Sequence, residues 1–174
     1  MKKYEINSEN RVIALIDFGN VKTGDVGGLV ESENNLSHDG LCWVYGDARV
    51  YGDARVSDNA RVCGNAQVFG NAQVYGNAQV FGDAWVFGDA RVSGDARVYG
   101  DARVYGDCSK TPTVISGLRY LITITDSDLK AGCQFNSLDY WKSVKDIQLR
   151  AMDGDDAVEF YHNTLKPLIE LLKV

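Results

Sequence analysis

The sequence contains little of what many metal-binding, nucleic-acid-binding and membrane proteins rely on. It has two histidines, and its four cysteines form no CxxC pair, so no metal is expected and zinc is a minor alternative. No segment is rich in lysine or arginine, and the net charge is −6, so binding to a nucleic-acid backbone is not expected. No run approaches about 18 apolar residues, so we expect no membrane contact.

The amino terminus and the cysteines both bear on the cellular compartment. Residues 1–10 have no apolar core, so no signal peptide is expected. Cys42 and Cys108 fall in phase with alanines that we expect to point inward, where a thiol acts as a small apolar filler. We therefore expect reduced cysteines and a cytoplasmic protein.

One short repeat dominates the middle of the chain. Its form is V-[YF]-G-[DN]-A-[RQ], with little variation, and its valines recur every six residues: Val44, Val50, Val56, Val62, Val68, Val74, Val80, Val86, Val92, Val98 and Val104. A period held over 44–109 is typical of a solenoid, in which each unit buries its apolar side by stacking on other units. With three units to a coil, the repeats make about 3.7 coils.

A single unit shows the physical logic of the repeat. Alternation along a short strand points Ala48 and Val50 inward, and Arg49 and Tyr51 outward. The Gly-Asp pair that follows turns the corner, because both residue types tolerate a left-handed backbone. Aspartates stacked at successive corners repel one another, and calcium held between them is a minor alternative to screening by water.

We divide the chain into an N-terminal cap with an irregular coil (1–43), the repeats (44–109) and a C-terminal cap (110–174). The first region includes a predicted strand at 11–18. Val30 and Leu36 are already six residues apart, but the next interval, to Val44, is eight and breaks the phase.

The C-terminal region has mixed patterns. Residues 118–135 predict two strands around a polar turn, and Asn136-Ser137 predicts the cap of a short helix. Residues 155–173 have helical apolar spacing, with a kink or break expected at Pro167.

The repeats resemble those of the hexapeptide-repeat family of left-handed β-helix proteins. The resemblance implies the left hand, which the period alone does not. We therefore expect an all-β solenoid, a left-handed parallel β-helix of hexapeptide repeats. A small C-terminal α/β cap ending in a helix follows it.

The outward positions divide into three faces, because each face recurs every 18 residues. The first face, from Trp43/Tyr45 to Arg97/Tyr99, is nearly as aromatic as the second, and the third is mostly polar. The second face supplies the candidate ligand-binding or interface residues: Arg49, Tyr51, Phe69, Trp85, Phe87, Arg103 and Tyr105. Exposed aromatic surface indicates a subunit interface or cover for the C-terminal helix. A platform that stacks a nucleobase and pairs with its phosphate is the alternative.

The best-known members of the hexapeptide-repeat family are trimeric CoA-dependent acyltransferases, which commonly use a histidine base. The corresponding candidate is His38, followed by Asp39, in the lead-in loop, whereas His162 lies on the C-terminal helix. We assign His38 a catalytic role, and CoA a role as cofactor, only if the protein is an acyltransferase. Otherwise we assign no catalytic residue and no cofactor.

The segments 16–40 and 122–141 resemble those of phage- and prophage-borne hexapeptide-repeat proteins, often labelled as transferases or polymer-forming proteins. This resemblance implies a mobile-element setting and the host cytoplasm, and it carries no catalytic residue set. Within the second segment, Cys133, Gln134 and Trp141 form a second candidate site, with a packed structural cap as the alternative.

The function expected is that of a non-catalytic, homotrimeric binding or interaction protein. Its expected partner is a small anionic ligand, such as a nucleotide-type signal, or a host protein. The alternatives are a CoA-dependent acyltransferase and a self-assembling scaffold.

Overall fold

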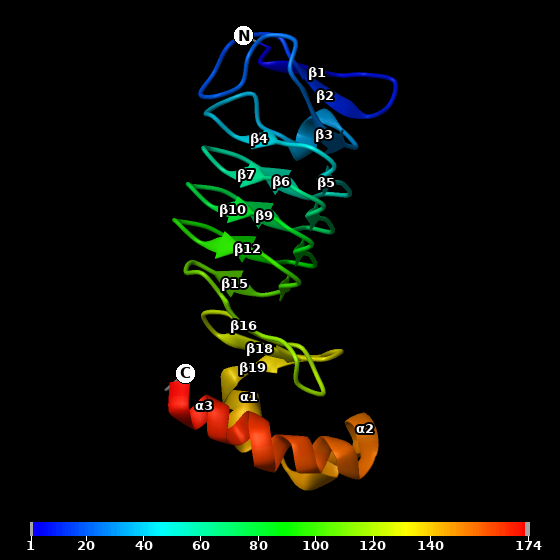
Figure 1. Ribbon diagram of the computed structural model, residues 1–174, viewed down its shortest axis with the longest axis vertical. Coiled ribbons are helices and arrows are strands. Elements are labelled where there is room, and N and C mark those ends of the chain that lie inside the picture. Colours follow the sequence, from blue (N-terminus) through cyan, green and yellow to red (C-terminus); the bar gives the residue numbers. More distant parts are fainter. Residues whose placement is uncertain (1, 173–174) are drawn as a thin grey trace.

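The computed structural model describes residues 2–172 as an elongated molecule (Figure 1). A β-solenoid of about four turns forms its middle, a small group of strands closes the amino-terminal end, and a sheet with helices follows at the other end. Positions 1, 173 and 174, which include the end of the predicted helix at 155–173, lie outside the described residues.

Each repeat contributes one very short strand to the solenoid. The strands are β4 (Trp43–Val44), β5 (Arg49–Val50), β6 (Arg55–Val56), β7 (Arg61–Val62), β8 (Gln67–Val68), β9 (Gln73–Val74), β10 (Gln79–Val80), β11 (Trp85–Val86), β12 (Arg91–Val92), β13 (Arg97–Val98), β14 (Arg103–Val104) and β15 (Asp107–Cys108). Val62 lies opposite Val80 in a parallel pair, eighteen residues along, so three repeats make one coil. The predicted β-solenoid is confirmed.

The interior of the solenoid is a column of alanines and valines. Every inward alanine and valine from Ala48 to Val104 is at most 1% exposed. Cys42 and Cys108 are also fully buried, as predicted. Cys108, however, lies opposite Val92, sixteen residues away, and so takes a valine position rather than the predicted alanine position. The last corner is thus shorter than the others, and there Gly106 lies directly against the side chain of Asp128.

The corners of adjacent coils are joined by a ladder of side-chain hydrogen bonds. The amide groups of one coil donate to carboxylates of the next: Asn65 to Asp83 at 3.0 Å, Asn71 to Asp89 at 2.8 Å and Asn77 to Asp95 at 3.1 Å. Placing asparagine beside aspartate replaces a repulsion between stacked carboxylates with an attraction.

The first coil is longer than the others. Strand β2 (Arg11–Ala14) pairs antiparallel with both β1 (Tyr4–Ile6) and β3 (Val26–Val30), and β3 joins the solenoid beside β5. Val30 lies opposite Val50, twenty residues along, which accounts for the break in phase before Val44. The strand predicted at 11–18 ends early, at Ala14, because the Asp17 carboxylate accepts the Thr23 N–H at 2.9 Å and helps close a turn.

The amino-terminal end of the solenoid is closed around a buried lysine. Lys3 is 2% exposed, and its Nζ donates to the backbone oxygens of Asp39, Gly40 and Cys42 at 3.4, 3.4 and 3.1 Å. The same segment covers Trp43, whose ring lies 5.4 Å from that of Phe18. Trp43 was expected on the open first face, but it is 1% exposed because this cap packs over it.

A four-stranded antiparallel sheet closes the other end. It consists of β16 (Thr113–Ile115), β17 (Ile122–Ile124), β18 (Asp128–Ala131) and β19 (Gln134–Ser137). The sequence had predicted two strands here. Val114 packs on the solenoid core, whereas Ile122, Ile124 and Leu129 pack on the helices. The sheet therefore separates two apolar cores.

The helices differ from those predicted. They are α1 (Leu138–Ser143), capped by Ser137, α2 (Asp146–Phe160), a wide π-helical turn (Tyr161–Leu165) and α3 (Lys166–Leu172). The helix expected at 155–173 is thus part of a longer one that is interrupted at Asp153-Gly154, where Gly154 has φ +63°.

The chain does not break at Pro167. The Lys166 N–H instead donates to the carbonyl of Tyr161, five residues earlier. Proline lacks an N–H, and its ring crowds the carbonyl four residues back, so a wider turn just before it accommodates the ring.

Two glycine corners provide a test of how tightly the coils stack. Gly70 has φ +72°, and a Cβ there would lie 3.0 Å from the backbone N of Gly88. Gly100 has φ +63° and no neighbour within 4 Å of the same position. We expect Gly100→Ala to lose about 1 kcal/mol of stability through backbone strain, and Gly70→Ala to lose about 1 kcal/mol more through crowding. Urea unfolding followed by circular dichroism measures both, and equal losses would contradict the close stacking.

Candidate functional site

The second face carries an aromatic column, which we define as Tyr51, Phe69, Phe87 and Tyr105. The ring centroids of Tyr51 and Phe69 are 5.0 Å apart with an interplanar angle of 2°, and those of Phe69 and Phe87 are 5.4 Å apart at 11°. Phe87 and Tyr105 meet edge to face at 5.4 Å. Coils about 4.8 Å apart bring successive rings into stacking range, so each coil adds one ring.

The aromatic column continues into the C-terminal sheet. The ring of Phe135, on β19, lies 4.6 Å from that of Tyr105. Tyr105 is 38% exposed, and the other three rings are half-buried. Cover at this end therefore comes from a strand, not from the C-terminal helix.

The basic residues of the second face lie far apart along it. The Arg103 guanidinium sits 4.2 Å above the Trp85 ring, a cation–π contact. Arg49 lies three coils away on β5, about 14 Å at the usual strand spacing, so the two arginines do not converge on one small ligand.

Lys130, on β18, adds a second positive charge near Arg103. Partial burial lowers the pKa of Lys130; nearby Cys133 opposes this shift, and the charge of Arg103 adds to it. Within residues 2–172, neither side chain forms an ion pair with a carboxylate. The junction between solenoid and sheet therefore holds Arg103 over the Trp85 ring, with Lys130 close enough to interact with the charge of Arg103.

His38 is held by the amino-terminal cap. Its ring stacks on Tyr4 at 4.2 Å, and its Nδ1 accepts the backbone N–H of Lys3 at 3.2 Å. Asp39 is not its partner, since among the described residues no hydrogen bond joins the two side chains. His162, the other histidine, lies 2.8 Å from Asp146 on the surface.

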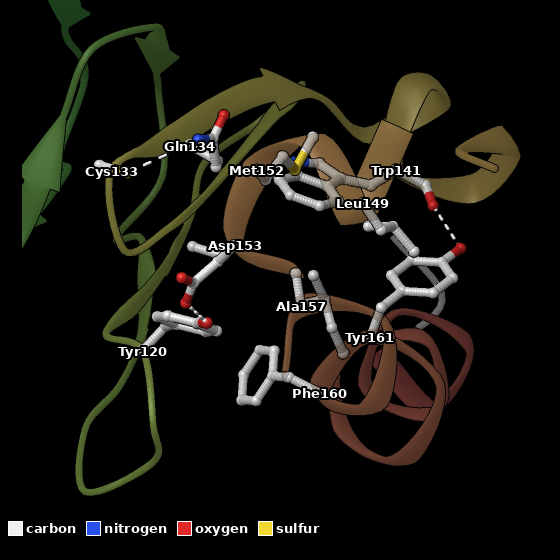
Figure 2. A pocket seen from close by; sticks show the side chains of 12 residues that line it. Tyr120, Cys133, Gln134, Trp141, Leu149, Met152, Asp153, Ala157, Phe160 and Tyr161 are labelled. Carbon is white, nitrogen blue, oxygen red and sulfur yellow. Dashed lines mark hydrogen bonds between the residues drawn. The ribbon is translucent and has the colours of Figure 1, made fainter. Parts of the chain in front are cut away.

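Cys133, Gln134 and Trp141 come together around one cavity of about 220 Å³ (Figure 2). It lies between the C-terminal sheet and the helices, on the side of the sheet away from the solenoid. Its other walls come from α2 and the π-helical turn and include Leu149 and Phe160, which sequence reasoning did not select.

The aromatic walls of the cavity are fixed by hydrogen bonds that point away from it. Trp141 Nε1 donates to the Leu129 carbonyl at 2.8 Å, and the Tyr161 hydroxyl donates to the Trp141 carbonyl at 2.6 Å. Both bonds are buried, and burial raises the pKa of Tyr161. Because these polar atoms are already satisfied, the rings present apolar surface to the cavity.

Polar groups gather at the mouth of the cavity, where Cys133 is exposed (Figure 2). The Tyr120 hydroxyl donates to the Asp153 carboxylate, which raises the pKa of Tyr120. Asp153 reaches this place because α2 is interrupted there. The Asp-Gly dipeptide at 153–154 is a breaker signal, and it could have revealed this site in the sequence.

Two further features of residues 2–172 concern metals and membranes. Across this range, no group of three or more histidine, cysteine or acidic residues is arranged to hold a metal ion. Each helix in the same range is too short or too polar to cross a bilayer.

The repeats match the family model of the YdcK beta solenoid repeat at residues 44–58, 54–70, 72–88, 90–106 and 96–109. Together with the observed coils, this match decides the class of the molecule. The chain is a repeat β-helix protein. No curated protein matches it.

Thiol reactivity tests the positions of the cysteines in this β-helix protein. Burial, followed by the charge of Asp126, raises the pKa of Cys108 to about 12. At pH 8 the Cys108 thiol is therefore almost entirely protonated, and the side chain is fully buried. We expect iodoacetamide to label exposed Cys133 first and to leave Cys108 unlabelled, as measured by peptide mass spectrometry. Labelling in urea is the control, and rapid reaction of Cys108 in the folded protein would contradict its burial.

Proposed function

We propose that the protein is a non-catalytic, homo-oligomeric binding protein whose subunits associate through the aromatic column. The observation that carries this proposal is the repetition of one aromatic ring in every coil along a single face, each in contact with the next. Such a surface is costly to leave in water, and its extent along the molecule suits a long interface.

A second copy of the same chain fits this surface better than an unrelated partner does. Its coils have the same spacing of about 4.8 Å, so rings of two parallel copies meet in register along the whole column. The third face, with Arg55, Gln73 and Arg91, offers no comparable apolar surface. We propose a trimer, because the three-sided coil presents one such face to a threefold axis.

We also propose a small anionic ligand, of nucleotide type, at the junction of solenoid and sheet. The support is the pair of cations, Arg103 and Lys130, without a carboxylate partner in residues 2–172, beside the Trp85 ring. The Trp85 ring holds Arg103 in place through the cation–π contact, and the two cations neutralise a phosphate. A host protein is the other partner class proposed.

We also propose a left-handed coil of the hexapeptide-repeat type, a phage or prophage setting, and the host cytoplasm as the compartment. Their support is the resemblance of the repeats, of 16–40 and of 122–141 to such proteins.

Acyl transfer with His38 as base is less well supported. A general base needs a free lone pair, and the lone pair on Nδ1 of His38 already accepts the Lys3 N–H. Assembly end to end into filaments is also less well supported. One end of the solenoid is closed by the amino-terminal segment around buried Lys3, and the other by the C-terminal sheet.

The oligomer can be tested by placing a charge on either of two faces. Phe69→Asp puts a carboxylate in the aromatic column, and we expect the oligomer to dissociate to monomers, because burying an unpaired charge at an interface is unfavourable. The matched control is Phe81→Asp, which changes the same residue type on the first face, where Phe81 stacks on Tyr99 at 5.4 Å. Light scattering after gel filtration measures the mass.

Dissociation by Phe69→Asp alone supports the assignment of the second face. Dissociation by Phe81→Asp alone would instead assign the interface to the first face. An intact oligomer in both variants, with unchanged circular dichroism, rejects the aromatic column as the interface.

The anion site has its own matched pair of variants. Arg103→Gln removes the cation that lies over Trp85, and we expect binding of a purine nucleoside monophosphate to weaken by about tenfold or more. Arg49→Gln makes the same change three coils away and should leave the affinity unchanged. Isothermal titration calorimetry measures both, and equal effects, or no binding by the wild type, would rule out this site.

A further inference from the structure

The C-terminal cavity has the properties of a binding site that is independent of the proposed oligomer and anion site. It is lined by aromatic and aliphatic side chains from α1, α2 and the π-helical turn (Figure 2). Trp141, Leu149, Tyr161 and Leu165 are all at most 3% exposed, so most of its walls belong to the packed core of this region. A space of this kind, inside a folded core, favours an apolar occupant.

The chemistry of the mouth is set by Asp153. Its acidic neighbours in α2 each have a partner: Asp155 lies 2.8 Å from the Arg150 guanidinium, Asp156 pairs with Arg119, and Asp146 lies 2.8 Å from the His162 ring. Asp153 has no such partner within residues 2–172, and it accepts a hydrogen bond from the Tyr120 hydroxyl.

Arg119 lies close enough to interact with the charge of Asp153, but it does not neutralise the mouth. Its Nε donates to the Tyr120 hydroxyl at 3.2 Å, but its ion pair is with Asp156. The group formed by Arg119, Asp153 and Asp156 therefore carries a net charge of −1, from one cation and two anions. Such a mouth repels an anion and attracts a cation.

The aromatic walls strengthen the same preference. Tyr120, Trp141, Phe160 and Tyr161 surround the space, and aromatic faces attract ammonium groups through their quadrupole. The size of the ligand follows from the volume. An engineered apolar cavity of about 150 Å³ holds benzene, so about 220 Å³ holds a molecule of about nine non-hydrogen atoms.

We propose that this cavity binds a small hydrophobic amine, with its apolar part between Trp141, Leu149 and Phe160 and its ammonium group at the Asp153 carboxylate. Asp153 sits in the right place because the chain turns there. Gly154 adopts φ +63°, which interrupts α2 and leaves the preceding side chain at the mouth.

The test compares three ligands of similar size and different charge. The probes are 2-phenylethylamine, 2-phenylethanol and phenylacetate, titrated into the full-length protein by calorimetry at pH 7. We expect the amine to bind about tenfold or more tightly than the alcohol, and the acid to bind most weakly. Tighter binding of the acid, or equal binding of all three, would overturn the proposal.

Two variants locate the charge. Asp153→Asn keeps the shape and the acceptor for Tyr120, so we expect the preference for the amine over the alcohol to fall below about threefold. Asp155→Asn removes the same charge from a residue that pairs with Arg150, and it should keep the full preference. An unchanged preference in Asp153→Asn, or an equal loss in both variants, would overturn the role of Asp153.

Two readouts locate the cavity itself. The amine should shift the nuclear magnetic resonance signal of the Trp141 indole N–H. This measurement uses the wild-type protein, so it does not depend on the folding of a variant. Ala157→Leu fills part of the cavity, so it should weaken the binding of both the amine and the alcohol by about tenfold or more. Binding without a Trp141 shift would place the ligand elsewhere and overturn the proposal.

Discussion

The narrow interior of the solenoid is the constraint on which the rest of the structure depends. Alanine and valine fill it from Ala48 to Val104 with at most 1% exposure, so a larger inward side chain has no space. Each coil must therefore lie directly on the one before it, and equivalent outward residues form columns. The stacked rings of Tyr51 and Phe69 and the hydrogen bond from Asn71 to Asp89 both follow from this alignment.

A stack of identical coils leaves an open apolar surface at each end, and the two ends are closed differently. Buried Lys3 and the covered Trp43 complete the first coil, which is lengthened by two residues. The other end is closed by a sheet rather than by another coil. Because a sheet has two faces, closing the solenoid with one of them leaves the other to be covered, and the helices that cover it create the cavity.

The sequence predicts the repeating part of the molecule well and the rest only in outline. A period of six determines the strands, the inward residues and the three faces, because each follows from local alternation. The burial of Trp43, the contact of Tyr105 with Phe135 and the position of Asp153 depend on packing between segments that do not repeat. Cys133, Gln134 and Trp141 attracted notice as a pattern, but the cavity that joins them also needs Tyr120 and α2, which no local rule connects to them.

The C-terminal sheet gives the two proposed ligand sites opposite charge. Successive residues of β18 point to opposite faces, so Lys130 faces the solenoid near Arg103, whereas Leu129 and Ala131 face the helices. The cations thus lie on one side of the sheet and Asp153 on the other. The sheet and its buried side chains lie between the two proposed sites, so alternation along a single strand accounts for their different charge.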